Sequence, residues 1–245
     1  MEREKAIEKA ARMLRQSRKT VALTGAGVST ESGIPDFRSA GGLWARFDPM
    51  EYGTLGAFEE DPRKVWNMLR ELIGIADAEP NAGHMAMAEF EKSGILKGII
   101  TQNIDMLHQK AGSHTVVEFH GSIRAFTCLE CGRKYELDEV HRMALPPECE
   151  TCSAILKPDV VFFDEQIPVL ALQQTEDLLR GADLLLVAGT SCQVVPASMI
   201  PGRVRHGGGS IIEINKELAL SGMAEISFAA GFSETMTALA EALSL

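Results

Sequence analysis

Residues 20–27 read TVALTGAG, a short run of β-branched and apolar residues that ends in two glycines separated by alanine. The run predicts a buried strand, followed by a tight turn at Gly25-Ala26-Gly27 and the start of a helix. This layout is typical of nucleotide-binding units, because glycine lets the backbone approach a phosphate. The turn lacks the third glycine of Gly-x-Gly-x-x-Gly, and no clear acidic ribose-binding residue follows it. A purely structural turn is therefore an equal alternative.

Helical and strand patterns alternate on both sides of this segment. Apolar residues at helical spacing predict a surface helix over residues 3–16. Further strands are predicted at 95–101, 116–119, 184–188 and 211–214, and further helices at 84–91, 169–180 and 233–243. Such alternation favours a parallel sheet covered on both faces. The predicted fold class is α/β, a Rossmann-like parallel sheet with helices on both faces, plus a small zinc-ribbon and helical module.

Two insertions interrupt this pattern. Residues 36–80 have scattered charge, both tryptophans and a helical pattern around residues 62–75, which predicts a small helical insertion that includes a cofactor loop. Residues 121–157 contain two cysteine pairs and few large aliphatic side chains. We therefore expect a Rossmann-like, NAD-binding domain made of residues 1–35, 81–120 and 158–245.

The cysteine spacing predicts a metal site in the second insertion. Cys128-x-x-Cys131 and Cys149-x-x-Cys152 have the spacing of a zinc ribbon. Four thiolates close the coordination shell of Zn²⁺, so one structural zinc per chain is expected. His141, between the pairs, is interpreted as a surface residue. Cys192, outside them, is interpreted as a small buried residue.

Composition excludes several classes of protein. The net charge of −10 argues against a protein that binds nucleic acid directly through its phosphates. No apolar run reaches the ~20 residues of a membrane span, and the N-terminus has no signal-peptide core. A cytoplasmic protein that does not contact a membrane is the simplest expectation. The acidic surface would suit basic polypeptides, although acidity for solubility alone explains it as well.

Polar residues directly after two predicted strands are candidates for a site. Gln102, Asn103 and Asp105 follow one apolar run, and residues after a parallel strand's carboxyl end line the ligand crevice. A helix cap explains Asn103 or Asp105 equally well. His120 follows another strand, where its ordinary pKa suits general-base chemistry. Taken alone, a histidine there is more often structural.

Taken together and in this order, the motifs resemble the sirtuin family of NAD-dependent protein deacylases. The matching segments are 25–29 (GAGVS), 32–38 (SGIPDFR), Pro80-Asn81 with His84, 101–105 (TQNID), His120-Gly121, the two cysteine pairs, Gly189-Thr190-Ser191 with Pro196-Ala197, and Ile214-Asn215. They extend over nearly the whole chain, which makes the ordered set far more specific than any single motif.

The resemblance implies a role for each of these residues. NAD would bind across the carboxyl edge of the sheet, and Val161, Phe162 and Asp164 would contact the acyl-lysine substrate. His120 would act as general base, and Asn103 would orient the nicotinamide–ribose region. The implied cofactor-binding residues are Gly25, Ala26, Gly27, Asp36, Phe37, Arg38, Gln102, Asn103, Asp105, Gly189, Thr190, Ser191 and Asn215.

The function implied is an NAD-dependent protein-lysine deacetylase that acts on an acyl-lysine-bearing protein or peptide and releases nicotinamide and O-acyl-ADP-ribose. Neutral acyl groups are expected, because Leu69 and Leu72 align with the Tyr-x-x-Arg pair of sirtuins that remove acidic acyl groups. A mono-ADP-ribosyltransferase on the same fold is the first alternative. A non-catalytic NAD-sensing module is the second.

Three positions depart from the family pattern. Ser39 and Asp164 stand where glycine is common, and Ala230 replaces a glycine beside the adenine. Aspartate tolerates positive φ better than most residues, so the loop at Asp164 is expected to keep its shape while gaining a carboxylate.

Overall fold

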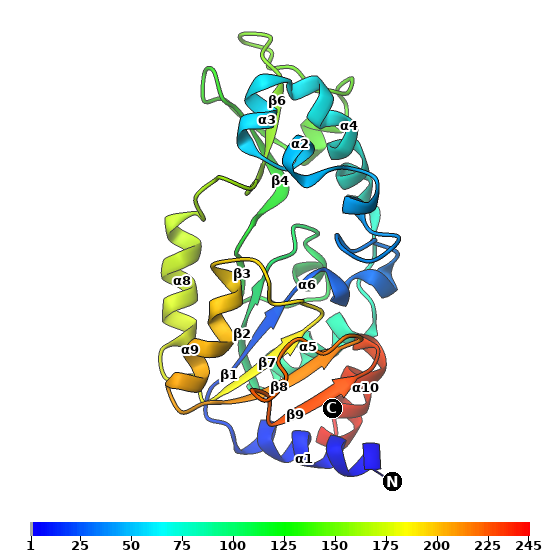
Figure 1. Cartoon of the computed structure of the whole chain (residues 1–245), viewed down its shortest axis with the longest axis vertical. Coiled ribbons are helices and arrows are strands. Elements are labelled where there is room, and N and C mark those ends of the chain that lie inside the picture. Colours follow the sequence, from blue (N-terminus) through cyan, green and yellow to red (C-terminus); the bar gives the residue numbers. More distant parts are fainter. Residues whose placement is uncertain (1) are drawn as a thin grey trace.

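The computed structural model describes residues 2–245 and divides them between two lobes (Figure 1). The large lobe is built on a six-stranded sheet with the order β3-β2-β1-β7-β8-β9, in which every neighbouring pair is parallel. Its strands are β1 (Thr20–Thr24), β2 (Leu96–Thr101), β3 (Val116–Glu118), β7 (Leu184–Ala188), β8 (Ser210–Asn215) and β9 (Ile226–Ala229).

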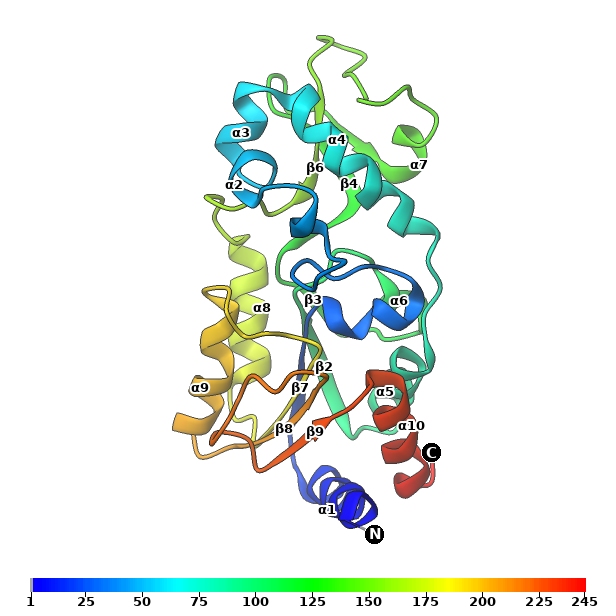
Figure 2. The ribbon, with the colours of Figure 1, turned by 45° about the vertical axis from the view of Figure 1, so that its right-hand side comes forward.

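Helices cover both faces of this sheet, which confirms the predicted fold class (Figures 1 and 2). One face packs against α1 (Glu2–Gln16), α5 (Ala82–Lys92) and α10 (Phe232–Leu243). The other packs against α8 (Val169–Leu179) and α9 (Ile200–His206). Every residue of β1 and β7 is buried, as expected for central parallel strands.

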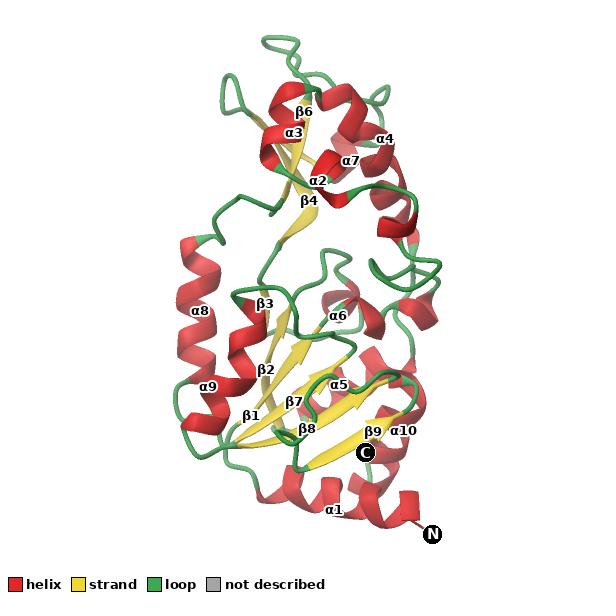
Figure 3. Cartoon of the chain, in the orientation of Figure 1, coloured by secondary structure: helices red, strands yellow, loops and turns green. Residues whose placement is uncertain are grey.

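The small lobe has a separate, antiparallel sheet with the order β5-β4-β6 (Figure 3). Its strands are β4 (Gly121–Cys128), β5 (Lys134–Glu136) and β6 (Leu156–Val160), and its helices are α2 (Pro49–Tyr52), α3 (Leu55–Glu60), α4 (Pro62–Ile73) and α7 (Leu137–Val140). We use "small lobe" for residues 43–73 and 121–160.

The two predicted insertions form one packed unit. The Trp66 ring of α4 stacks on Phe126 of β4 with 6.2 Å between centroids, and its indole nitrogen donates to the Leu156 carbonyl at 2.9 Å. Leu69 and Tyr135 belong to the same buried cluster. Segments that lie far apart in the sequence therefore share a single core.

The structure corrects the prediction that a helix starts after the glycine turn. Only two short 3₁₀ turns follow β1, at Ala26–Val28 and Thr30–Ser32. Gly33 then has φ of 84°, a left-handed conformation that ends helical structure. The Glu31 carboxylate is bound elsewhere, because it accepts hydrogen bonds from the backbone nitrogens of Phe232 and Ser233 at the start of α10. The segment thus connects two elements instead of extending as a helix.

The remaining differences between the predicted and the observed elements are small. Strand β9 and the strands of the small lobe were not predicted, and α6 (Leu107–Lys110) is a single turn. Across residues 2–245, the helices are all too short or too polar to cross a membrane.

Candidate active site between the two lobes

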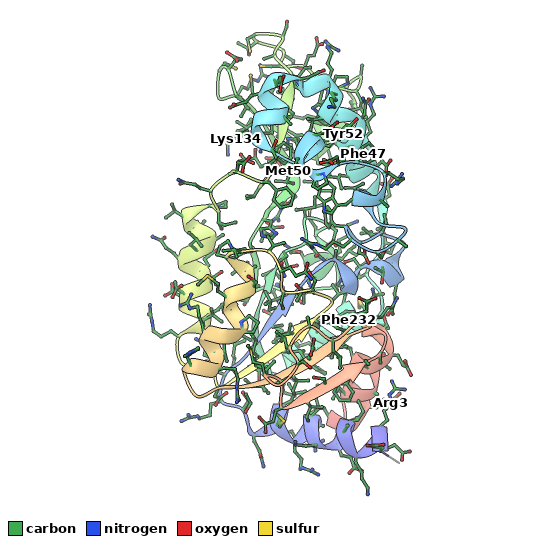
Figure 4. The ribbon with its side chains drawn as sticks, viewed as in Figure 1. Arg3, Phe47, Met50, Tyr52, Lys134 and Phe232 are labelled. Atoms are coloured by element: carbon green, nitrogen blue, oxygen red, sulfur yellow. The ribbon has the colours of Figure 1, made fainter. Side chains whose placement is uncertain are left out.

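A cavity of about 750 Å³ lies between the carboxyl edge of the large sheet and the small lobe. Loops after β1, β2, β7 and β8 line one side, as parallel-sheet topology requires. Trp44, Met68, Leu72 and Phe163 line the other. Phe232, labelled at the start of α10 in Figure 4, contributes to the floor.

Nearly all the residues predicted from the sequence line this one cavity. They are Gly25, Ala26, Gly27, Asp36, Phe37, Arg38, Gln102, Asn103, His120, Val161, Phe162, Asp164, Gly189, Thr190, Ser191 and Asn215. Asp105 is the exception, since it is buried behind the wall.

The glycines make the loops after β1 and β7 touch. A Cβ on Gly27 would lie 2.8 Å from the Gly189 Cα, and one on Gly189 would lie 2.3 Å from the Val28 nitrogen. Gly189 also has φ of 60°. Side chains are therefore excluded here by close packing, and the backbone forms the cavity wall.

Asp105 supports the site through a buried chain of hydrogen bonds. The Asn103 amide donates to the Ser29 hydroxyl at 3.1 Å, and that hydroxyl donates to an Asp105 oxygen at 2.7 Å. The other Asp105 oxygen accepts from the Leu107 nitrogen at 3.0 Å. The N-cap residue of α6 is Met106, so neither Asn103 nor Asp105 occupies the capping position that the sequence left open. The chain fixes the Asn103 side chain at the cavity wall.

Asn215 is held in a similar way. Its side-chain oxygen accepts from the Thr190 nitrogen at 2.9 Å, and its amide donates to Glu213 at 2.8 Å. Glu213 is fully buried and also accepts from the Ala219 nitrogen at 2.6 Å. Asn215 therefore anchors the loop after β7 in addition to lining the cavity.

His120 has one ring nitrogen committed to the protein. Its Nδ1 lies 3.2 Å from the Gln102 carbonyl, which can only accept, so Nδ1 carries the hydrogen of the neutral ring. The lone pair is then on Nε2. Burial lowers the pKa of His120, although the Gln102 hydrogen bond opposes this by favouring the charged form. The neutral ring, the form that accepts a proton, is thus favoured at neutral pH.

The segment from Val161 to Asp164 joins the lobes beside His120. The Val161 nitrogen donates to the His120 carbonyl at 2.8 Å, and the Phe163 nitrogen donates to the Gly53 carbonyl at 2.8 Å. Asp164 has φ of 70°, which confirms that aspartate adopts the left-handed conformation expected at this family glycine. Ser39 needs no such conformation; its nitrogen donates to the Asp36 carboxylate at 2.7 Å.

The helix α4 presents one of the two aligned leucines, together with Met68, to the cavity. Met68 and Leu72 line the cavity, whereas Leu69 packs in the core of the small lobe. Of the two leucines aligned with the Tyr-x-x-Arg pair, Leu72 therefore lines the cavity and Leu69 does not, and the alignment itself stays a prediction. Arg70 points away, since its guanidinium donates to the Leu145 carbonyl at 2.8 Å on the outside of the lobe.

The four paired cysteines converge as predicted. Their sulfur atoms all lie within 4.8 Å of one another, with 3.4 Å between those of Cys128 and Cys152 and 3.6 Å between those of Cys131 and Cys149. Tetrahedral Zn²⁺ with bonds of about 2.3 Å places sulfurs about 3.8 Å apart, so the set fits this metal. Tyr135 donates to the Cys149 sulfur at 3.3 Å, and a hydrogen bond donated to sulfur stabilises the thiolate that zinc binds.

Two further predictions concern His141 and Cys192, and several residues of the site were not predicted. His141 is exposed as expected, and Cys192 is half-buried, with burial raising its pKa to about 11. Ser29, Glu213 and Met68 were not identified as site residues. Position after a parallel strand is the signal that identifies Lys216 and Glu217, which follow β8 and also line the cavity.

Sequence comparison finds the same pattern in known proteins. The sequence model of the Sir2 family matches residues 25–196. An NAD-dependent protein deacylase of Thermococcus sibiricus is 44% identical over 241 residues, which cover 95% of this chain and 94% of that protein. NAD-dependent protein deacylase 1 of Archaeoglobus fulgidus is 42% identical over 234 residues, covering 95% and 96%.

Comparison with solved structures identifies Sir2 enzymes as well. A Sir2 enzyme structure superposes with a TM-score of 0.92 at 37% identity and covers 98% of both chains. Another, a Sir2 protein bound to deacetylated p53 peptide and 3′-O-acetyl-ADP-ribose, superposes with a TM-score of 0.90 at 32% identity, covering 96% of this chain and 97% of that one.

Proposed function

The chain belongs to the Sir2 family, the sirtuins, and from this premise we propose the reaction that its cavity performs. It is an NAD-dependent protein-lysine deacetylase that accepts neutral acyl groups and releases nicotinamide and O-acyl-ADP-ribose. The observation that carries this assignment is the single cavity shared by the glycine loops, Asn103 and His120. NAD is the co-substrate, and an acyl-lysine-bearing protein or peptide is the second substrate.

NAD supplies an anomeric carbon that becomes electrophilic as nicotinamide departs, and the weakly nucleophilic acyl oxygen of the substrate attacks it when closely positioned. The loops at Gly25–Gly27 and Gly189–Ser191 would hold the phosphate and adenosine parts. The Phe37 ring contacts Trp44, with 5.3 Å between centroids, and thereby holds the loop at residues 36–38 against the small lobe. That loop would close over the nicotinamide side.

His120 is the proposed general base. Its free Nε2 would accept a proton from a ribose hydroxyl, which then attacks the imidate carbon formed on the acyl group. Cleavage of the carbon–nitrogen bond releases the lysine amine, and addition of water leaves the acyl group as an ester on ADP-ribose. The Gln102 carbonyl keeps the proton on Nδ1 and so maintains the required tautomer. Asn103, fixed through Ser29 and Asp105, would orient the ribose region or a water molecule.

The cysteine cluster has a structural role in this proposal. Cys128, Cys131, Cys149 and Cys152 would hold one zinc ion per chain, and four thiolates leave no open coordination position for a reactant. We further propose that residues 1–35, 81–120 and 158–245 form the NAD-binding domain, that residues 36–80 form a small helical insertion with the cofactor loop, and that residues 121–157 form a zinc-binding module. We expect the protein in the cytoplasm, which fractionation of the source cells tests.

Product identification tests the function. The protein is incubated with NAD and an acetyl-lysine peptide library, with omission of NAD as the control, and the products are analysed by mass spectrometry. Deacetylated peptide together with acetyl-ADP-ribose is the expected result. Protein or peptide made heavier by ADP-ribose would instead identify a transferase, and NAD binding without any product would identify a sensing module.

A further inference from the structure

Lys157, on β6, is a buried cation that the reaction as described does not use. It is only 5% exposed, and its ammonium lies behind the cavity wall. Burying an ammonium group is costly unless hydrogen bonds and an opposite charge compensate. The Lys157 ammonium is therefore expected to have several compensating partners.

All of these contacts go to the next eight residues of the chain. The ammonium donates to the carbonyls of Pro158 at 3.3 Å and Val160 at 2.9 Å. It pairs with the Glu165 carboxylate at 2.9 Å and lies 4.4 Å from the centroid of the Phe162 ring. One cation thus holds both ends of the segment 160–165.

Glu165 closes this arrangement from the other side. The same carboxylate oxygen that meets Lys157 accepts a hydrogen bond from the Phe162 nitrogen at 2.7 Å. The Glu165 nitrogen donates back to the Phe162 carbonyl at 3.2 Å, forming a turn with Asp164 in the left-handed conformation. The turn is therefore fixed by its own backbone and by the ion pair.

This turn forms the substrate side of the cavity. Residues 160–165 all line it, and the Phe162 ring lies between the cavity and the Lys157 ammonium. The same segment is tied to the His120 carbonyl through Val161. A shift of the turn would move the cavity wall relative to the proposed general base.

We propose that Lys157 and Glu165 together are positioning residues for the acyl-lysine substrate: the ion pair between buried Lys157 and half-buried Glu165 holds the Phe162–Glu165 turn in its substrate-binding shape. Stability alone does not explain the pair, because apolar residues of similar volume often replace buried ion pairs without loss of stability. The proposal rests on the proposed deacetylase function. It assigns neither residue to a bond-making step.

The test measures KM for an acetyl-lysine peptide, kcat and the Kd for NAD in three variants: Lys157→Met, Glu165→Gln and the double variant. Loss of a hydrogen bond to a charged group weakens binding by about tenfold. The KM for the peptide should therefore rise by about that factor in each single variant. The Kd for NAD should stay within about twofold, because the loops at Gly25–Gly27 and Gly189–Ser191 belong to the large lobe and do not contact the turn's ion pair. Since the two residues act as a pair, the double variant should match the worse single variant instead of multiplying the effects.

Lys134→Met is the matched control. Lys134, labelled in Figure 4, belongs to the same small sheet and pairs with Asp159 at 3.6 Å, but it is exposed. Its KM should equal that of the native protein. If Lys157→Met fails to fold, Glu165→Gln still tests the proposal, because glutamine can accept from the Phe162 nitrogen while lacking the charge.

Two results would overturn the proposal: an unchanged peptide KM in a folded Glu165→Gln protein, or single effects that multiply in the double variant. Absence of deacetylation by the native protein in the same assay would instead overturn the proposed function, so the two failures are distinguishable.

Discussion

The two lobes reach folded structures by different means. The large lobe buries aliphatic strands and three helices on one face of its sheet, in a core rich in alanine, leucine and isoleucine. The small lobe has a short antiparallel sheet and a core that includes Trp66, Phe126 and the sulfur ligands Cys128 and Cys149. Small units rarely bury enough apolar area alone and need a metal or disulfides. The comparison teaches that the cofactor side of the cavity rests on an extensive apolar core, whereas the substrate side rests on a small core completed by four cysteines that fit a zinc ion.

Loss of the metal should produce the largest difference in stability between the two lobes. Zinc binding to structural thiolate sites is worth about 10 kcal/mol or more, so Cys149→Ser or chelation should unfold the small lobe and leave the large sheet folded. Hydrogen exchange should show protection lost in β4 and β6 and kept in β1 and β7. Metal analysis of native protein purified without chelator should give one zinc per chain.

Cys192→Ser is the control for that experiment, because Cys192 lies in the large lobe, away from the cluster. It should retain full zinc content. Native protein that contains no zinc would contradict the prediction.

The next largest effect is expected at His120, where the lobes meet. Removing a general base costs about 100- to 10,000-fold in rate, so His120→Ala should nearly abolish deacetylation. NAD binding should persist, since the glycine loops are untouched, and calorimetric titration measures it. A variant with close to native turnover would rule out His120 as the base.

The pH profile of kcat/KM provides an independent check on the same residue. Burial lowers the pKa of His120 from the ordinary 6.5, and the active form is the neutral ring. The rate should therefore be flat above pH 6.5 and fall only at more acid pH, as the ring gains its proton. An acid limb centred above 6.5 would contradict a neutral base.

The preference for acetylated over succinylated peptide is expected to be smaller than the effect of His120→Ala and larger than the effect of Asp164. Met68 and Leu72 provide an apolar wall, and Arg70 is turned outward to Leu145. An acidic acyl group would leave its carboxylate without a partner there, so acetylated peptide should react roughly 10- to 100-fold faster than its succinylated copy. Competition between the two peptides measures the ratio, and faster desuccinylation would refute the prediction.

The smallest effect is expected from Asp164, an exposed carboxylate on the substrate turn. An added peptide strand there would place Lys or Arg beside it, and exposed ion pairs are worth up to about 1 kcal/mol, or about fivefold. Native protein should prefer peptides with basic residues flanking the acyl-lysine at low salt, and less so at high salt. Asp164→Gly should lose this preference; an identical preference in both proteins would leave the carboxylate without a role.

Local patterns predicted most strands of the large sheet, the cysteine ligand set and a few cavity residues, whereas the family resemblance supplied the other site residues. Continuous apolar runs identify buried parallel strands such as β1 and β7, because both faces of a covered sheet exclude water. Cysteine spacing identified the ligand set, since two pairs of this kind have few other uses in a reducing environment. The strand-end rule placed Gln102, Asn103 and His120 correctly at the cavity, because parallel strands point their carboxyl ends toward one edge.

Side-chain direction and partners were decided only by tertiary structure. Asp105 and Asn103 stand two residues apart, yet packing turns one behind the wall and the other into the cavity. Met68 faces the cavity and Leu69 the core of the small lobe, because the rotation of α4 is set by its contact with β4 and β6, segments about 60–90 residues away in sequence. Lys157 and Glu165 look like ordinary surface charges in the sequence. The burial of Lys157 and its pairing with half-buried Glu165 follow from a turn whose shape depends on both lobes, and no local pattern encodes such a long-range arrangement.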